Sequence, residues 1–230
     1  MKEERLILAL ETATPSGGVA VVGEKIYGEL FLSTQETHSR RLLSGVQYLL
    51  GRLKIELNDL AGIAVSLGPG SFTGLRIGLA TAKGLFLATG LPLLGVGTLE
   101  ALSLNASLSP YPICPVLDAR RKQVYAALYR LENGRPQEIL PPSLLDPEKL
   151  LNYITEPTVF LGDGLVPFGD FWAERLGPKF LRAPDFLQQP RPANVAYLGR
   201  RRLLAGELDD PYRLLPLYLR PSEAELQRRP

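Results

Sequence analysis

The sequence predicts an α/β protein built from two successive units, each with its elements in the order βββαβαβα. Two observations indicate this fold class. The stretch 66–100 reads as a strand end, a glycine-rich turn, a helix of small residues and a second strand, which together make one βαβ unit. The second half of the chain then repeats the plan of the first, as in a degenerate duplication. We therefore predict an N-terminal domain over residues 1–108 and a C-terminal domain with a tail over 109–230.

In the first half, three strands separated by turn signals form a predicted meander. They span residues 6–10, 18–22 and 26–32. A helix follows over 39–53, because its apolar residues recur at helical spacing and Thr37 or Ser39 can cap its N-terminus. The remaining elements are a buried strand, a long helix, a second buried strand and a short helix, at 62–66, 72–89, 93–96 and 98–107.

The second half shows the same alternation of strand and helix signals. Strands are predicted at 113–117, 123–131, 137–140, 158–161 and 180–182. Asn133 and Gly134 form the turn between the second and third of these strands. Helices are predicted at 147–154, 165–176 and 194–205, and Gly206 ends the last one.

The helix predicted over 72–89 has two apolar faces. One stripe at helical spacing is expected to pack on the unit's own sheet, and it comprises Leu75, Leu79, Ala82 and Phe86. The opposite stripe has smaller side chains: Ile77, Thr81, Gly84 and Ala88. Small side chains let another helix approach closely, and a monomer rarely leaves such a stripe exposed. With Leu43 and Leu50 of the preceding helix, this stripe is our predicted partner-binding surface. The alternative is that the protein's own fold covers both faces.

Three segments of the chain resemble the TsaB (YeaZ) family. They read LALETAT at 8–14, GPGSFTGLRIG at 68–78 and DARRKQVY at 118–125. The resemblance is strong over about the first 130 residues and returns in LYLRPSEAE at 217–225. It implies the ASKHA architecture of actin, hexokinase and Hsp70, in which two ribonuclease-H-like units follow one another.

The resemblance also implies a function. Members of this family take part in forming threonylcarbamoyladenosine at the adenosine 3′ of the anticodon in tRNA. They do so as non-catalytic partners that bind and activate a paralogous enzyme, TsaD, beside a small ATPase, TsaE. On this basis the chain alone binds no cofactor, ATP, magnesium and iron or zinc belong to the partner proteins, and tRNA is reached through the complex. We expect a heterodimer with TsaD and a homodimer, through the same surface, when the chain is alone.

Two carboxylates make the best case for chemistry in this chain. Glu11 and Asp118 follow the first strand of each half, where nucleotide-using ASKHA members hold hydrated magnesium. An ATP- and magnesium-dependent transferase or kinase is therefore the alternative function, and both residues, with Arg120, are candidate tRNA or nucleotide contacts. The turn after Asp118 is basic where a phosphate loop would be glycine-rich, so capping and ion pairing are the favoured roles. A third hypothesis, direct tRNA binding, would require residues 120–122 to contact phosphates.

Other catalytic sites find no support in the sequence. The segment GPGSFTG lacks the Gly-Lys-Ser/Thr ending of a phosphate-binding P-loop, and Ser71 is interpreted as a helix N-cap. His38 is the single histidine and Cys114 the single cysteine, so triad chemistry and a histidine zinc site are not indicated. TsaD-like sequences place two metal-binding histidines where this chain has Thr98 and Leu102. We therefore assign no catalytic, cofactor or metal residue.

Composition agrees with a globular protein. With 230 residues, 45% of them hydrophobic, the chain is long enough to bury a sizeable core. The net charge of +2 is too small for a dedicated nucleic-acid binder. No apolar run reaches the ~18 residues of a membrane span, and no signal peptide is visible, so we expect no membrane contact and a cytoplasmic location. Cys114 lies in an apolar run and is expected to be a small buried hydrophobe.

Overall fold

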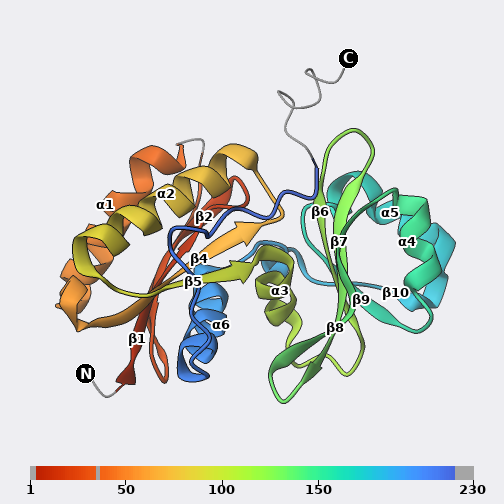
Figure 1. Ribbon diagram of the computed structural model, residues 1–230. Coiled ribbons are helices and arrows are strands. Elements are labelled where there is room, and N and C mark those ends of the chain that lie inside the picture. The colour runs from red at the N-terminus through yellow and green to blue at the C-terminus, as the bar shows by residue number, and fades with distance from the viewer. Residues whose placement is uncertain (1–3, 35–36, 221–230) are drawn as a thin grey trace. The chain divides into compact units, whose positions relative to one another are not determined.

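The computed structural model describes residues 4–34 and 37–220 (Figure 1). The chain divides into two compact units. Unit 1 consists of residues 1–98 and 190–217, and unit 2 consists of residues 99–189 and the segment that begins at Tyr218. In the described ranges, none of the helices has both the length and the apolar character needed to cross a membrane.

Unit 1 is built on a five-stranded sheet with the strand order β3-β2-β1-β4-β5. The strands are β1 (Leu6–Glu11), β2 (Ser16–Val22), β3 (Ile26–Ser33), β4 (Leu60–Gly68) and β5 (Leu93–Gly97). The first three strands pair antiparallel, as the predicted meander requires. Strands β4 and β5 run parallel to β1 and to each other, which places the carboxyl ends of β1, β4 and β5 at one edge of the sheet.

Helices cover both faces of this sheet. The helices α1 (His38–Leu53) and α2 (Phe72–Thr89) lie side by side on one face (Figure 1). On the other face, α6 (Pro192–Leu204) packs so closely that a Cβ atom at Gly199 would lie 2.5 Å from the Cβ of Ala64. Because successive side chains of a strand point to opposite faces, each central strand supplies both layers of the core.

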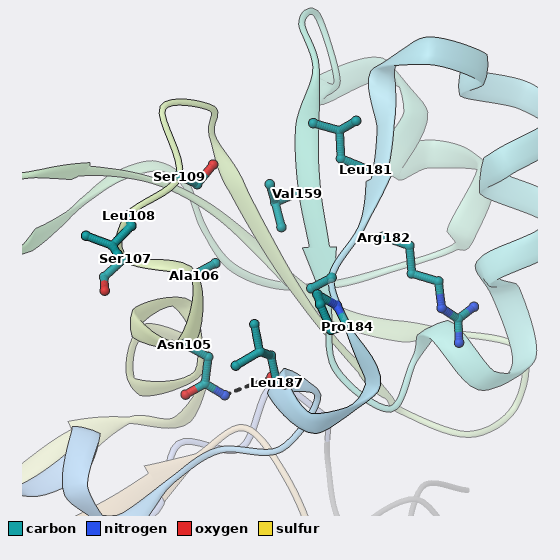
Figure 2. A pocket seen from close by; sticks show the side chains of 11 residues that line it. Asn105, Ala106, Ser107, Leu108, Ser109, Val159, Leu181, Arg182, Pro184 and Leu187 are labelled. Carbon is teal, nitrogen blue, oxygen red and sulfur yellow. Dashed lines mark hydrogen bonds between the residues drawn. The ribbon is translucent and has the colours of Figure 1, made fainter.

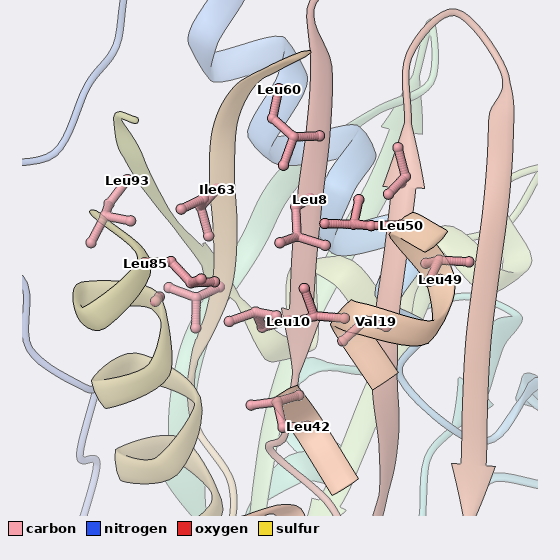
Figure 3. Packing of buried hydrophobic residues seen from close by; sticks show 14 of the residues in the cluster. Leu8, Leu10, Val19, Leu42, Leu49, Leu50, Leu60, Ile63, Leu85 and Leu93 are labelled. Atoms are coloured by element: carbon pink, nitrogen blue, oxygen red, sulfur yellow. The ribbon is translucent and has the colours of Figure 1, made fainter. Parts of the chain in front are cut away.

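The main core of unit 1 lies between the sheet and the α1/α2 layer. Figure 3 shows Leu8 and Leu10 of β1 meeting leucines from the two helices, among them Leu42 and Leu85. Leu8 and Leu10 are fully buried. Full burial of one leucine contributes about 1.5–3 kcal/mol, so a layer of this kind stabilises the unit strongly.

Unit 2 has a second five-stranded sheet, in the order β10-β9-β6-β7-β8. Its strands are β6 (Ile113–Asp118), β7 (Val124–Glu132), β8 (Arg135–Leu145), β9 (Thr158–Leu161) and β10 (Phe180–Arg182). Its helices are α3 (Thr98–Ser103), α4 (Pro147–Leu150) and α5 (Leu165–Leu176). Short 3₁₀ turns occur at Leu57–Asp59 in unit 1 and at Leu104–Ala106, Leu151–Tyr153, Gly177–Lys179 and Asp185–Leu187 in unit 2.

The two sheets have the same topology. Read from its first strand, each sheet has the order 3-2-1-4-5, with strands 1 to 3 antiparallel and strands 1, 4 and 5 parallel. This is the ribonuclease-H-like arrangement, and two such units in one chain make the ASKHA fold that the sequence predicted. The order βββαβαβα along each half is confirmed as well, and the helix predicted over 72–89 has those bounds.

The observed division of the chain differs from the predicted one. The sequence pattern placed the boundary after residue 108, whereas unit 2 begins at Leu99 and residues 190–217 return to unit 1. The physical reason is the packing of two helices. Leu99 and Leu102 of α3 join the core of Ile113 and Leu117 in unit 2, and α6 packs on the sheet of unit 1. Helical periodicity shows that a helix has an apolar face but does not show which sheet covers it.

Candidate functional site

The glycine-rich turn before α2 seats that helix on the turn between β1 and β2. A Cβ atom would lie 2.4 Å from Ala13 O at Gly70 and 2.1 Å from Thr12 O at Gly74, so only glycine permits this approach. The Ser71 backbone N–H donates to Ala13 O over 2.7 Å. Ser71 Oγ accepts a hydrogen bond from the Gly74 N–H at 3.2 Å, which confirms the predicted N-cap. The geometry of the turn thus serves helix packing.

The inner face of α2 follows the prediction with one correction. Leu75, Leu79 and Ala82 are buried against the sheet as expected. Phe86 is only half-buried and packs against the margin of the core, while Leu85, which we had not predicted, is a buried member of it. Phe86 packs edge-on against the Tyr212 ring, with 5.8 Å between ring centroids. Successive residues of a helix point about 100° apart around its axis. At the margin of the apolar face, spacing alone therefore does not show which of two neighbouring apolar residues is buried.

The outer face of α2 is small and apolar. Gly84 and Ala88 are exposed, while Ile77 and Thr81 are half-buried. A Cβ atom at Gly84 would meet nothing within 4 Å, so the backbone is open to a neighbour at this point. The structure adds two exposed residues that we had not predicted, Ala80 and Leu87, and Leu87 is 72% exposed. Their spacing of seven residues, two helical turns, was the available signal.

Helix α1 extends this surface but lacks one predicted member. Leu43 is 52% exposed and Tyr48 is 60% exposed. Leu50, in contrast, is 7% exposed and belongs to the core, as Figure 3 shows, so its assignment to a free surface was wrong. The cause is the wide buried arc of α1, which takes in both Leu49 and Leu50. We give the name helix face to eight exposed or half-exposed residues of the two helices: Leu43, Tyr48, Ile77, Ala80, Thr81, Gly84, Leu87 and Ala88.

Glu11 ends β1 in the interior of unit 1. Its side chain is fully buried, and Oε1 accepts a hydrogen bond from the Ala13 N–H at 2.6 Å. Oε2 is buried without a hydrogen-bond partner among the described residues. Burial raises the pKa of Glu11 to about 7, and the bond from Ala13 opposes part of that rise. Glu11 therefore caps its own turn, and its charge changes close to neutral pH.

Asp118 occupies the matching position in unit 2 and has different contacts. Its Oδ1 accepts a hydrogen bond from the Arg120 N–H at 2.8 Å, and its Oδ2 pairs with the Arg120 guanidinium at 3.0 Å. Its backbone N–H donates to Asp163 Oδ1 at 2.9 Å. Burial raises the pKa of Asp163. Sequence reasoning missed Asp163, although the Gly-Asp-Gly run just after a strand was a signal for a strand-end acid.

The arrangement of the acidic side chains bears on metal binding. Within residues 4–34 and 37–220, no three His, Cys, Asp or Glu side chains are grouped so that they could hold a metal ion. Each of the two strand-end acids, Glu11 and Asp118, accepts the backbone N–H two residues further on. This geometry is the turn-capping role that the sequence analysis favoured for them.

The remaining reactive side chains lie in the interior. Cys114 is fully buried in the core of unit 2, as predicted, and burial raises the pKa of its thiol. His38 is buried in unit 1, where its Nε2 lies 2.8 Å from Thr14 O. Burial lowers the pKa of His38, which favours the neutral imidazole.

The segment near the C-terminus contacts its own unit. Arg220 donates hydrogen bonds to Ala119 O and to Gln123 Oε1, both in the turn that follows β6. Residue 225, the last of the family-like segment 217–225, lies outside the described residues.

Unit 2 also has a pocket of about 460 Å³ beside strands β9 and β10 (Figure 2). Val159, Leu181 and Leu187 give it an apolar wall, and Asn105 on its rim donates hydrogen bonds to Leu187 O and Gln189 O. None of the predicted site residues lines it.

Comparisons with known proteins point to one family. A family model described as TsaD, tRNA N6-adenosine threonylcarbamoyltransferase, matches residues 28–226. The tRNA threonylcarbamoyladenosine biosynthesis protein TsaB of Bacillus subtilis is 34% identical over 223 residues, which cover 95% of this chain and 96% of the relative. The TsaB protein of Haemophilus influenzae is 29% identical, with 93% of each chain covered. The solved structure of YeaZ from Pseudomonas aeruginosa superimposes with a TM-score of 0.80 at 28% identity, covering 93% of this chain and 99% of that one.

Proposed function

The chain belongs to the TsaB family of tRNA threonylcarbamoyladenosine biosynthesis proteins, and we propose that it binds and activates TsaD, the enzyme that transfers the threonylcarbamoyl group to tRNA. In this proposal the chain itself is not catalytic. ATP, magnesium and iron or zinc are bound by partner proteins, TsaD and the ATPase TsaE, and tRNA reaches the chain within their complex in the cytoplasm. The observation that carries the proposal is the helix face of unit 1.

The helix face has the properties of a docking surface for another helix pair. Gly84 and Ala88 leave the backbone of α2 open, so a partner helix can approach to the short end of the usual 8–10 Å interaxial range. Leu43, Tyr48 and Leu87 offer larger apolar side chains on the same layer. Burying a leucine of this kind against a partner contributes about 1.5–3 kcal/mol, and ordering the interface offsets part of that gain.

The partner's own fold supports this choice. The TsaD family model matches residues 28–226 of this chain, a range that includes both α1 and α2. TsaD should therefore present a related helix pair, and two related helix pairs can pack about a two-fold axis. The same reasoning predicts that the isolated chain pairs with a second copy of itself through the helix face.

The alternative function is an ATP- and magnesium-dependent transferase or kinase that uses Glu11 and Asp118. One observation favours this alternative: Oε2 of buried Glu11 has no hydrogen-bond partner among the described residues. The turn-capping contacts of both carboxylates favour a structural role.

The decisive experiment is threonylcarbamoyl transfer to tRNA by purified TsaD with this chain added. The substitution Ala88→Arg places an unpaired charge in the helix face, and breaking an interface in this way costs several kcal/mol. We expect loss of co-sedimentation with TsaD, loss of activation and a shift of the isolated chain from dimer to monomer. Ala173→Arg is the matched control, because Ala173 is exposed on α5 of unit 2.

A second pair of substitutions tests the alternative. Glu11→Gln and Asp118→Asn together keep the hydrogen-bond acceptors and remove both charges. We expect the double variant to activate TsaD as well as the wild type does. If it folds and binds TsaD but does not activate it, the chain contributes chemistry and the proposed role is wrong.

A further inference from the structure

The turn between β6 and β7 has an uncommon backbone. Arg120, Arg121 and Lys122 have φ values of 61°, 52° and 60°, so three successive residues with side chains adopt the left-handed conformation. All three side chains are exposed. This conformation is disfavoured for residues other than glycine, asparagine and aspartate, because Cβ comes too close to the backbone.

The choice of residues in this turn calls for a reason beyond joining two strands. Glycine or asparagine would adopt the same conformation with less strain. Arginine and lysine offer nothing to a left-handed turn except their long cationic side chains. Strained backbone of this kind collects at binding sites, where the surrounding structure holds it in place.

The surrounding structure does hold this turn at both ends. The Ala119 N–H donates to Gln123 O, and the Gln123 N–H donates to Arg120 O, each over 3.0 Å. Gln123 Nε2 donates to Asp146 Oδ1 at 3.3 Å. Arg220 donates to Ala119 O and Gln123 Oε1 from the C-terminal segment and adds a fourth cation at the base of the turn. A turn fixed in this way loses little freedom when it binds.

Among the described residues around the turn, cations outnumber acids. Asp118 pairs with Arg120, whose side chain is nevertheless 83% exposed. Asp163 lies deeper, and burial raises its pKa, which favours its neutral form. Lys122 makes no ion pair with the described residues of the chain. Asp146, which accepts from Gln123, is the third acid near the turn, and it pairs with Lys149 outside the turn. Four cations stand on the turn or at its base: Arg120, Arg121, Lys122 and Arg220.

We infer that this basic turn, residues 119–123 with Arg220, binds phosphate groups of an RNA backbone. Exposed cations gain affinity for a polyanion by releasing its counterions, and several of them on one turn suit successive phosphates. Arginine also matches the geometry of phosphate oxygens through paired N–H donors. The inference rests on the proposed function, which brings tRNA to the complex that contains this chain.

The test is the affinity of a fluorescently labelled, unmodified tRNA transcript for the full chain, measured by anisotropy between about 50 and 200 mM salt. The variant is Arg121→Asn with Lys122→Asn, because asparagine keeps the left-handed turn and removes two charges. The matched control is Arg5→Asn with Lys54→Asn, since these exposed cations in unit 1 also have positive φ, 47° and 54°. We expect the turn variant to bind about tenfold more weakly, with a salt slope lower by about 2, and the control to keep the wild-type affinity and slope.

Two results would overturn the inference. One is equal tRNA affinity and salt slope for the turn variant and the control. The other is unchanged tRNA affinity together with lost binding of a labelled ATP, which would assign the turn to free nucleotide. Failure of the proposed function has a separate signature. The turn variant should still co-sediment with TsaD, whereas Ala88→Arg should not, so the two measurements fail independently.

Discussion

The two units share one sheet topology, yet the turn after the first strand is buried in one and open in the other. In unit 1, Glu11 is fully buried, and the turn that follows packs against the glycines at the start of α2. In unit 2, Asp118 is partly exposed, and the turn at 120–122 projects three cations into solvent. Strand order alone therefore does not determine what the strand ends do. Local residues decide, through glycines in one unit and basic residues in the other.

The helix layers differ in the same way. Unit 1 has the 16-residue α1 and the 18-residue α2 side by side, with a small-residue outer surface. In unit 2, the helices that follow the third and fourth strands are the 4-residue α4 and the 12-residue α5. A long, doubly apolar helix pair suits protein docking, and an open basic turn suits a polyanion. The two units thus have different proposed roles: the helix face of unit 1 contacts TsaD, and the basic turn of unit 2 contacts RNA.

The largest expected effect comes from comparing a buried and an exposed leucine of α1. The comparison tests whether one side of this helix packs on the core and the other is free to bind a partner. Leu50→Ala removes a buried side chain and should lower the free energy of unfolding by about 2–5 kcal/mol in urea titration. Leu43→Ala changes an exposed residue and should lower it by less than about 0.5 kcal/mol, while weakening binding to TsaD. Equal destabilisation by both would mean that Leu43 belongs to the core.

The next prediction concerns the closed strand end of unit 1. Burial raises the pKa of Glu11 from 4.5 to about 7, so the folded protein holds this proton over a pH range in which the unfolded chain has lost it. The stabilising contribution is complete below about pH 4.5 and is lost as pH rises through about 7. That interval corresponds to a loss on the order of 3 kcal/mol.

Glu11→Gln should remove this part of the pH dependence. The free energy of unfolding of both proteins can be measured by urea titration at pH 5 and pH 8. Between these two pH values, that of the wild type should fall relative to that of the variant. Parallel pH profiles for the two proteins would show that Glu11 is not buried as described.

A matched pair of glycine substitutions tests how closely α2 rests on the β1–β2 turn. Gly74→Ala places a methyl group 2.1 Å from Thr12 O and should destabilise the fold by about 1–3 kcal/mol through overpacking. Gly84→Ala fills open space and should stabilise the helix by up to about 1 kcal/mol. Opposite signs in thermal unfolding are expected. Stabilisation by both substitutions would contradict the close seating of α2.

Local signals in the sequence were enough to place most elements, and non-local packing accounts for what they missed. The bounds of α2 could be predicted because Ser71 caps one end and Gly90 the other. Leu50 was assigned to the surface because spacing along a helix does not give the width of its buried arc. The Asp118–Asp163 contact joins residues 45 positions apart, and the sheet that receives α6 ends at Gly97, whereas α6 begins at Pro192. Such pairings depend on the assembled fold.

The smallest expected effect concerns the strain in the open turn of unit 2. If Lys122 is kept for its charge at the expense of backbone strain, Lys122→Gly should raise the free energy of unfolding. The left-handed conformation costs an L-residue about 1–2 kcal/mol, and glycine relieves this strain. Glycine's greater freedom in the unfolded chain opposes the stabilisation by about 0.5–1 kcal/mol. A net increase of about 0.5 kcal/mol is expected, with weaker tRNA binding. Lys54→Gly in unit 1, with φ of 54°, should gain similar stability without any change in tRNA binding. A loss of stability in Lys122→Gly would show that the turn is not strained, and the reason for its basic residues would then lie in the fold itself.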